Sequence, residues 1–245
     1  ATRAKRTEYL EKMGIDCVLE LAFTRELAAR SPEEFVREYL LPLHVRYIVT
    51  GYDFSLGRGR MGHTNELRLL GNQLGFSVEQ MPPLMLAGDV VSSTRLRSLL
   101  LNGQIEEANT LLGHPYELEG TVIHGHGRGR QIGFPTANLA TPGTVLPREG
   151  VYACYTFVQG RLCPSVLNIG TNPTFAADRL SIECFLLDEE KDLYDEHLEI
   201  LFLARLRGEQ KFPHAQALGE QIARDVEKAR LLFQKTPPEA FLAWC

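Results

Sequence analysis

Cysteine is scarce and scattered in this 245-residue sequence, and its spacing argues against two common uses of the residue. The chain has five cysteines, and no two of them form a C-x-x-C pair: Cys17, Cys154, Cys163, Cys184 and Cys245. An odd, scattered set is unlike a disulfide framework or a zinc site. It fits reduced thiols, so we expect a cytoplasmic protein.

Several other features are also missing from the sequence. No apolar run approaches the roughly 20 residues that span a bilayer, and no signal peptide is visible. There is no internal repeat or low-complexity tract. The net charge of -5 lacks the basic excess of a general nucleic-acid binder. We therefore expect neither a membrane nor a nucleic acid as a partner, and we interpret local basic spots as sites for small anions.

What is present is the composition of an ordinary globular protein. Apolar residues make up 44% of the chain and charged residues 23%, which allows a sizeable core. The length leaves room for one large domain or two modest ones.

The first part of the chain, residues 1–113, alternates between helical and strand-like patterns. Ser31, Pro32 and Glu34 combine an N-cap, a first-turn proline and a capping box at one helix start. Alternating elements favour a parallel α/β sheet, and the apolar run at 45–50 is typical of a buried parallel strand. Helices are predicted at residues 3–13, 31–41 and 65–74, and strands at 16–21, 45–50 and 76–80.

The pattern changes near residues 111–115. Residues 117–204 contain short β-type runs separated by Gly, Pro, Asn and Asp clusters, which is typical of an antiparallel barrel or sandwich. Residues 214–234 then have apolar residues at helical spacing. We expect domains at residues 1–113 and 114–236, followed by a tail at 237–245.

The strongest chemical signal is the glycine-rich segment 125–138. Glycines let a backbone approach a ligand closely, and consecutive loop N–H groups can form an anion-binding concavity. Arginines add charge that suits phosphate, and neutral side-chain oxygens suit a magnesium ion held mostly by substrate phosphates. A plain hairpin turn is the alternative. The residues concerned are Gly125, Gly127, Arg128, Gly129, Arg130, Gly133, Thr136 and Asn138.

A series of short motifs surrounds this segment in a fixed order. They include residues 120–122, 133–139, 150–153, 168–175, 183–188, 192–194 and 209–212. This series resembles the riboflavin kinase domain of the bacterial bifunctional riboflavin kinase/FMN adenylyltransferase (FAD synthetase) family, and it covers nearly all of residues 115–235. The resemblance implies an antiparallel β-barrel riboflavin kinase domain with a C-terminal helix.

The resemblance also implies roles for three residues. Thr136 and Asn138 would help hold Mg²⁺ and the ATP phosphates, and Glu183 would be the base for the riboflavin 5′-hydroxyl. The alternatives are a turn role for Asn138 and a solvated strand position for Glu183. If Ile182 faces the barrel core, alternation turns Glu183 outward. Asp195 replaces the family's usual glycine, and we expect the turn to be retained because Asp tolerates positive φ.

A second signal lies at residues 92–97. Ser92, Ser93, Thr94, Arg95 and Arg97 open a predicted helix, where hydroxyls can simply cap the helix or, with arginines, bind a triphosphate. The segment resembles the Ser-Ser-Thr-x-x-Arg motif of nucleotidylyltransferases. Residues 51–54 and 57–60 also resemble that domain, with Leu56 in place of the usual aromatic residue.

One motif of that domain does not occur in this sequence. The family's adenylyltransferase domain carries a His-x-Gly-His motif, and the sequence has none and begins with Ala1. We therefore expect an N-terminally truncated, incomplete Rossmann-like domain without efficient adenylyl transfer, whereas the full-length parent would make FAD. His124 and His126 could bind a metal, but no third ligand is evident.

The predicted function is ATP-dependent phosphorylation of riboflavin to FMN. ATP, riboflavin and FMN would be the small-molecule partners, and Mg²⁺ the cofactor. Two alternatives are a non-catalytic flavin-binding module and a small barrel that binds nucleic acid through Arg128 and Arg130. The intact Thr136, Asn138 and Glu183 argue against the first, and the acidic balance argues against the second.

Overall fold

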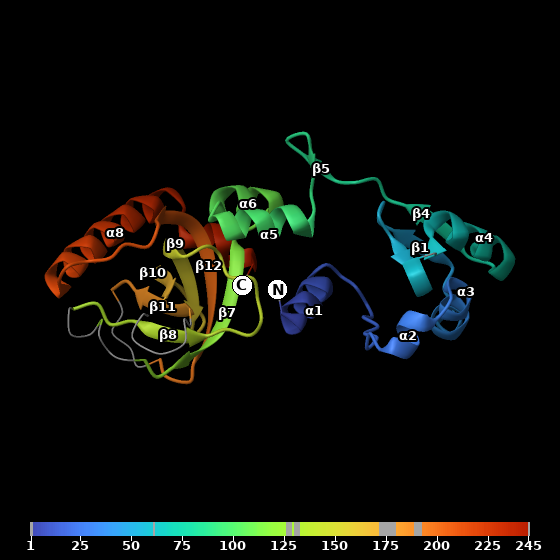
Figure 1. Cartoon of the computed structure of the whole chain (residues 1–245), viewed down its shortest axis with the longest axis horizontal. Coiled ribbons are helices and arrows are strands. Elements are labelled where there is room, and N and C mark those ends of the chain that lie inside the picture. The colour runs from blue at the N-terminus through green and yellow to red at the C-terminus, as the bar shows by residue number, and fades with distance from the viewer. Residues whose placement is uncertain are drawn as a thin grey trace. The chain divides into compact units, whose positions relative to one another are not determined.

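The computed structural model describes residues 2–60, 62–125, 129, 133–171, 180–188 and 193–244. The chain divides into two compact units (Figure 1). One unit consists of Ala1–Tyr9 together with Ser92–Cys245, and the other is Leu10–Val91. None of the helices in the described ranges combines the length and hydropathy that a bilayer span requires.

The larger unit is built on a closed antiparallel β-barrel, so the predicted barrel is confirmed. Its strands follow one another around the barrel in the order β10-β11-β8-β7-β12-β9. Closure leaves no unpaired sheet edge within the ring. The strands are β7 (Tyr116–Ile123), β8 (Ala137–Ala140), β9 (Gly150–Val158), β10 (Arg161–Thr171), β11 (Leu180–Leu186) and β12 (His197–Arg207).

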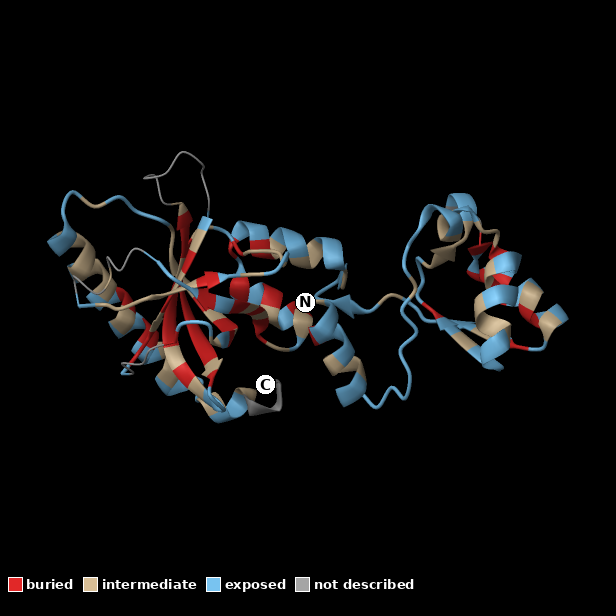
Figure 2. Ribbon diagram, turned by 90° about the horizontal axis from the view of Figure 1, so that it is seen from below, coloured by how far each residue is buried: buried red, intermediate tan, exposed pale blue. Residues whose placement is uncertain are grey.

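Alternating side chains fill the interior of this barrel. Leu139, Leu167 and Ile182 point inward and are at most 6% exposed. The ring of Phe202 packs against Tyr116 and Tyr152, with centroids 5.9 and 5.2 Å apart. Figure 2 shows this concentration of buried residues along the strands. The core therefore fixes which residues of each strand face outward.

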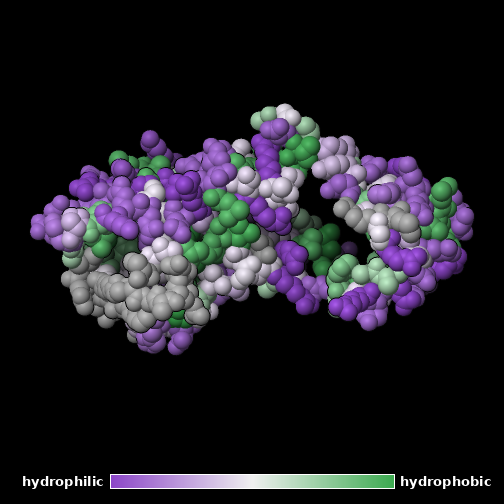
Figure 3. All heavy atoms as spheres, viewed as in Figure 1, coloured by the Kyte–Doolittle hydropathy of each residue, from purple (hydrophilic) through white to green (hydrophobic). Residues whose placement is uncertain are grey.

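Helix α8 (Ala215–Lys235) covers part of the outer face of the barrel, close to the predicted span of 214–234. Its apolar side packs on Val151, Ala153 and Val166, and its outer side is largely hydrophilic (Figure 3). Asp225, 1% exposed, accepts a 2.8 Å hydrogen bond from Arg207 of β12. This buried ion pair fixes the helix to the strand. A short helical segment, η4 (Pro238–Trp244), follows.

Three further helices belong to the barrel unit. Helix α5 (Ser93–Asn102) precedes α6 (Ile105–Leu112), and α6 packs on β7 and β12. The first residues of α1 (Arg3–Lys12) also join this unit. Lys5, 6% exposed, donates a 2.8 Å hydrogen bond to Glu199 of β12. This division differs from the boundary expected near residue 113, because α5 and α6 pack with the barrel.

The smaller unit contains a parallel two-stranded sheet, β1 (Tyr47–Thr50) with β4 (Ser77–Gln80). Helix α4 (Thr64–Leu74) packs on it around Leu67 and Phe76. The capping box of Ser31 and Glu34 is present at α3 (Pro32–Phe35), as predicted. The other elements are α2 (Arg25–Ala29), η1 (Val36–Leu40), η2 (Leu41–Leu43), β2 (Ser55–Leu56), η3 (Arg58–Arg60), β3 (Gly62–His63), β5 (Met85–Leu86) and β6 (Asp89–Val90).

Two local predictions for this unit are wrong. Residues 16–21 form no strand, and Val18 and Leu19 are 38% and 52% exposed. A β-type composition cannot make a strand without a partner for its backbone groups. Strand β1 is parallel, as predicted, but not buried, because Tyr47 and Val49 are each 55% exposed. Only the face bearing Ile48 and Val78 packs against the unit's apolar cluster.

Candidate active site

Three polar side chains form a row across neighbouring strands of the barrel. Glu183 of β11 pairs in register with Asn138 of β8 on one side and Asn168 of β10 on the other. Their chain neighbours Ile182, Leu139 and Leu167 belong to the core. The row is therefore on the outer face, and all three of its residues are half-buried. Ile182 faces the core, so the condition stated for an outward-facing Glu183 is met.

Thr136 joins this row from the segment before β8. Its hydroxyl donates a 3.4 Å hydrogen bond to Oε2 of Glu183. The Pro-Thr-Ala-Asn segment and the strand glutamate, 47 residues apart in the sequence, thus meet at one place. We call Thr136, Asn138, Asn168 and Glu183 the polar row.

Two glycines of the preceding segment lie against the polar row. A Cβ on Gly125 would collide with the amide of Asn138. A Cβ on Gly129 would collide with the carbonyl of Phe134 and lie 3.2 Å from Oγ1 of Thr136. Only glycine allows this close approach without moving the neighbours. Gly127, Arg128, Arg130 and His126 lie outside the described residues, as do residues 172–179.

The carboxyl groups of Glu209 and Glu149 lie close together beside the polar row. The side chain of Glu209 covers Gly170 of β10, where a Cβ would lie 2.5 Å from Oε1 of Glu209. Burial, followed by a hydrogen bond to Glu149, raises the pKa of Glu209. Sequence reasoning assigned no site role to Glu149 or Glu209. The pairing that brings them here depends on strand register, which a single sequence does not reveal.

The oxygen atoms of the polar row suit a magnesium ion. Thr136 and Asn138 offer neutral oxygens and Glu183 offers one carboxylate. Mg²⁺ is commonly held by one or two carboxylates together with substrate phosphates and water. Among the described residues there is no cluster of three or more His, Cys, Asp or Glu side chains that could hold a metal by itself.

An aromatic pair lies at the end of β7. The rings of His124 and Tyr194 stack with centroids 3.9 Å apart, and both residues are exposed. His124 thus has an aromatic neighbour that sequence reasoning did not anticipate. Beside it Asp195 adopts a φ of 64° and its N–H donates to the carbonyl of Val122. The turn expected at Asp195 is therefore present.

The second predicted site falls at the start of α5. Ser92 is the N-cap, and its side chain accepts a 3.2 Å hydrogen bond from the N–H of Arg95. Ser93, Thr94 and Arg97 are exposed, and Arg95 is half-buried. Ser92 therefore caps the start of α5. The exposed hydroxyls and Arg97 leave the helix start accessible to an anion.

Comparisons with known proteins identify the families of both parts of the chain. The riboflavin kinase (flavokinase) family model matches residues 112–233, and the FAD synthetase family model matches residues 1–95. A solved structure from Streptococcus pneumoniae, described as a macrolide-efflux protein, is similar with a TM-score of 0.86 and 31% identity. The similarity covers 94% of this chain and 74% of that one. The barrel thus lies in a phosphotransferase domain of the flavokinase class.

Similar sequences are described as bifunctional. The bifunctional riboflavin kinase/FMN adenylyltransferase of Listeria monocytogenes is 38% identical over 94% of this chain and 74% of its own length. The Escherichia coli K12 protein of the same description is 38% identical over 96% of this chain and 75% of its own length. The chain therefore belongs to the bifunctional riboflavin kinase/FMN adenylyltransferase family, whose activities are riboflavin phosphorylation and FMN adenylylation.

Proposed function

We propose that the polar row is the phosphoryl-transfer site of the riboflavin kinase domain. The observation that carries the proposal is the contact of Thr136 with Glu183 beside Asn138. Phosphoryl transfer depends mainly on positioning and charge stabilisation. A carboxylate, two neutral oxygens and a glycine-rich segment on one barrel face provide the residue types that this chemistry uses.

In this proposal, Glu183 accepts the proton of the riboflavin 5′-hydroxyl as that oxygen attacks the γ-phosphorus of ATP. The bond between the γ-phosphorus and the bridging oxygen breaks, and ADP leaves. Thr136 and Asn138 hold Mg²⁺ and the phosphates, and Mg²⁺ supplies charge neutralisation when it is bound. Gly125, Gly127, Arg128, Gly129 and Arg130 cradle the phosphates, in keeping with the known preference of arginine for phosphate.

We assign the second nucleotide site to residues 92–97 by the same reasoning. The accessible start of α5, with Ser93, Thr94 and Arg97 exposed, suits the triphosphate of the ATP used in FMN adenylylation. Arg97→Ala should then weaken one of two ATP-binding events in a calorimetric titration without changing FMN formation. Loss of FMN formation in this variant would contradict two separate ATP sites.

The direct test of the proposed function is product formation by the purified chain. Riboflavin and Mg-ATP should yield FMN, resolved from riboflavin by chromatography with fluorescence detection. Omission of Mg²⁺ should abolish the product. Riboflavin binding without turnover would instead favour a non-catalytic flavin-binding module and overturn the proposal.

Gly125→Ala should separate the positioning of Asn138 from the folding of the barrel. The added Cβ displaces the Asn138 amide, which is the free end of a side chain and can rotate away. A misplacement of about 1 Å can cost about 100-fold in rate, so we expect a loss of that order in FMN formation. The Tm should change little.

The matched control for this variant is Gly219→Ala. Gly219 lies within α8, and a Cβ there meets nothing within 4 Å. Alanine in a helix interior is more stable than glycine by about 0.5–1 kcal/mol, so this variant should keep full activity. If Gly125→Ala were as active as Gly219→Ala, Asn138 would have no positioning role.

A further inference from the structure

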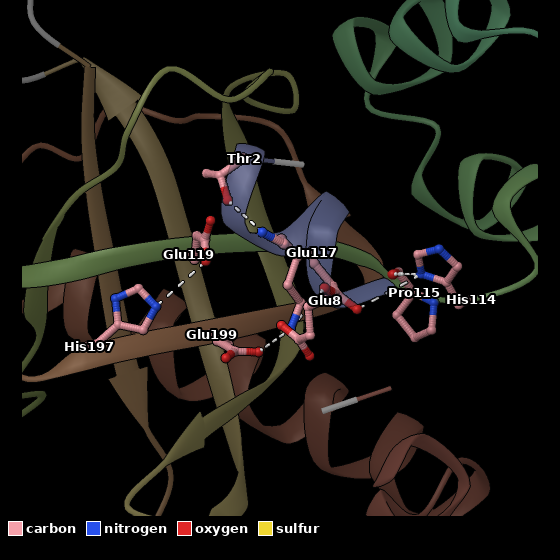
Figure 4. Close-up of polar contacts among 9 residues, drawn as sticks. Thr2, Glu8, His114, Pro115, Glu117, Glu119, His197 and Glu199 are labelled. Carbon is pink, nitrogen blue, oxygen red and sulfur yellow. Dashed lines mark hydrogen bonds and ion pairs between the residues drawn. The ribbon is translucent and has the colours of Figure 1, made fainter. Parts of the chain in front are cut away.

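A cavity of about 240 Å³ lies on the barrel unit, and no residue of the polar row lines it. Its walls come from α1, β7 and β12 and from the ends of α5 and α6. Figure 4 shows the polar residues around it, with α1 passing over β7 and β12. The family's motif residues quoted above do not include Tyr9, Glu117, Thr144 or Glu199, which line this cavity.

The polar atoms of this cavity are incompletely paired. Both carboxylate oxygens of Glu117, the hydroxyl of Tyr9 and the hydroxyl of Thr144 are buried and make no hydrogen bond. Lys5 is 3.7 Å from one Glu117 oxygen, and His114 is 4.0 Å from the other. Both separations exceed a hydrogen bond. Burial raises the pKa of the Glu117 carboxyl, and the neighbouring Tyr9 hydroxyl, Lys5 and His114 offset this only in part, so a further donor would stabilise the carboxylate.

Acceptors outnumber donors around this cavity. Glu117, Glu119 and Glu199 face it together with one lysine, Lys5. Lys5 directs its ammonium to Glu199, at 2.8 Å. A ring nitrogen of His114 is already engaged with the carbonyl of Pro115, at 2.8 Å. The excess negative charge and the unused acceptors both favour a ligand that is a cation and a hydrogen-bond donor.

The remaining lining of the cavity is apolar. Leu96, Leu112, Tyr116 and Leu118 contribute side chains to its walls. The ring of Tyr9 lies under a cation already, with Nζ of Lys5 5.8 Å from its centroid. The site therefore combines an anionic end with an apolar wall, as small-molecule sites commonly do.

We propose that this cavity binds a small organic ammonium ion. Its N–H groups would donate to Glu117, and its apolar body would lie against Leu112 and Tyr116. An ammonium group has three donors and no acceptor, which matches the unpaired atoms. Because α1 supplies part of the wall, the bound cation also holds the start of the chain on the barrel.

Calorimetric titration of the intact chain with benzylamine tests this proposal. Benzyl alcohol has the same shape without the charge, and benzoate reverses the charge. Benzylamine should bind saturably at one site per chain, and the other two should bind at least tenfold more weakly. Equal binding of benzyl alcohol, or no saturable binding of benzylamine because the cavity takes water only, would overturn the proposal.

Two variants test whether benzylamine binds at Glu117. Glu117→Gln should weaken benzylamine at least tenfold. Glu8→Gln removes a carboxylate that also contacts Lys5, at 3.3 Å, but does not line the cavity, so it should leave the affinity unchanged. Unaltered binding by Glu117→Gln would refute the site. FMN formation should persist in both variants and serves as the check of folding.

A third variant covers the case in which Glu117→Gln fails to fold. Leu112→Phe fills the cavity from the apolar side while keeping every charge. It should also abolish benzylamine binding. Retained binding in Leu112→Phe would place the amine elsewhere and contradict the proposal.

Discussion

Glu183→Gln is expected to lower the rate of FMN formation by about 100- to 10,000-fold, the usual contribution of a positioned general base. The amide keeps the size of the side chain and can still accept the hydrogen bond of Thr136. It cannot take the proton of the riboflavin 5′-hydroxyl. Riboflavin affinity, measured by fluorescence quenching, should therefore stay near that of the unchanged chain.

Glu119→Gln is the matched control for this prediction. Glu119 lies on β7 of the same barrel and outside the polar row, so its amide variant should keep FMN formation. A second comparison is Glu183→Asp, which retains a carboxylate but withdraws it from the substrate. It should recover part of the rate. Full activity in Glu183→Gln would remove Glu183 from the reaction.

Phe202→Ala is expected to destabilise the barrel by about 3–5 kcal/mol. Phe202 is fully buried and its ring contacts both Tyr116 and Tyr152. The substitution leaves a cavity between β7, β9 and β12. The closed barrel cannot easily contract to fill that cavity. Hydrogen exchange of peptides from β7, β9 and β12 should report this loss as reduced protection.

The control for the core prediction is the same change at an exposed phenylalanine. Phe23 is 85% exposed, so Phe23→Ala should leave the protection of the barrel peptides unchanged. Because the two variants remove identical atoms, the difference between them isolates burial. Similar protection in both would show that the barrel interior tolerates the loss of the Phe202 ring.

The sequence predicts the barrel well because its short β-type runs are separated by clusters of turn residues. Leu139, Leu167 and Ile182 face the interior as their neighbours' polarity suggests. The smaller unit is predicted less well. Residues 16–21 and 45–50 have the composition of strands, but composition says nothing about whether a partner strand or a covering layer is present. The structure leaves the first segment irregular and one face of the second exposed.

The candidate site is predicted in part for the same reason. The motif segment identifies Thr136 and Asn138, and alternation orients Glu183. Asn168 becomes part of the row only through its pairing with Glu183, and the stacking of Tyr194 on His124 joins segments 70 residues apart. These contacts depend on how the strands are aligned, and no local pattern encodes that alignment.

The pairing of Asn138, Glu183 and Asn168 has a genetic consequence. Side chains alternate along a strand, so one extra residue in β11 ahead of Glu183 would shift the pairing by one position. The carboxylate would then turn into the barrel, and an apolar residue would take its place outside. Insertions in this strand should be rejected far more strongly than substitutions at its exposed positions. A genetic selection for FMN formation would therefore detect a change in the alignment of these three strands.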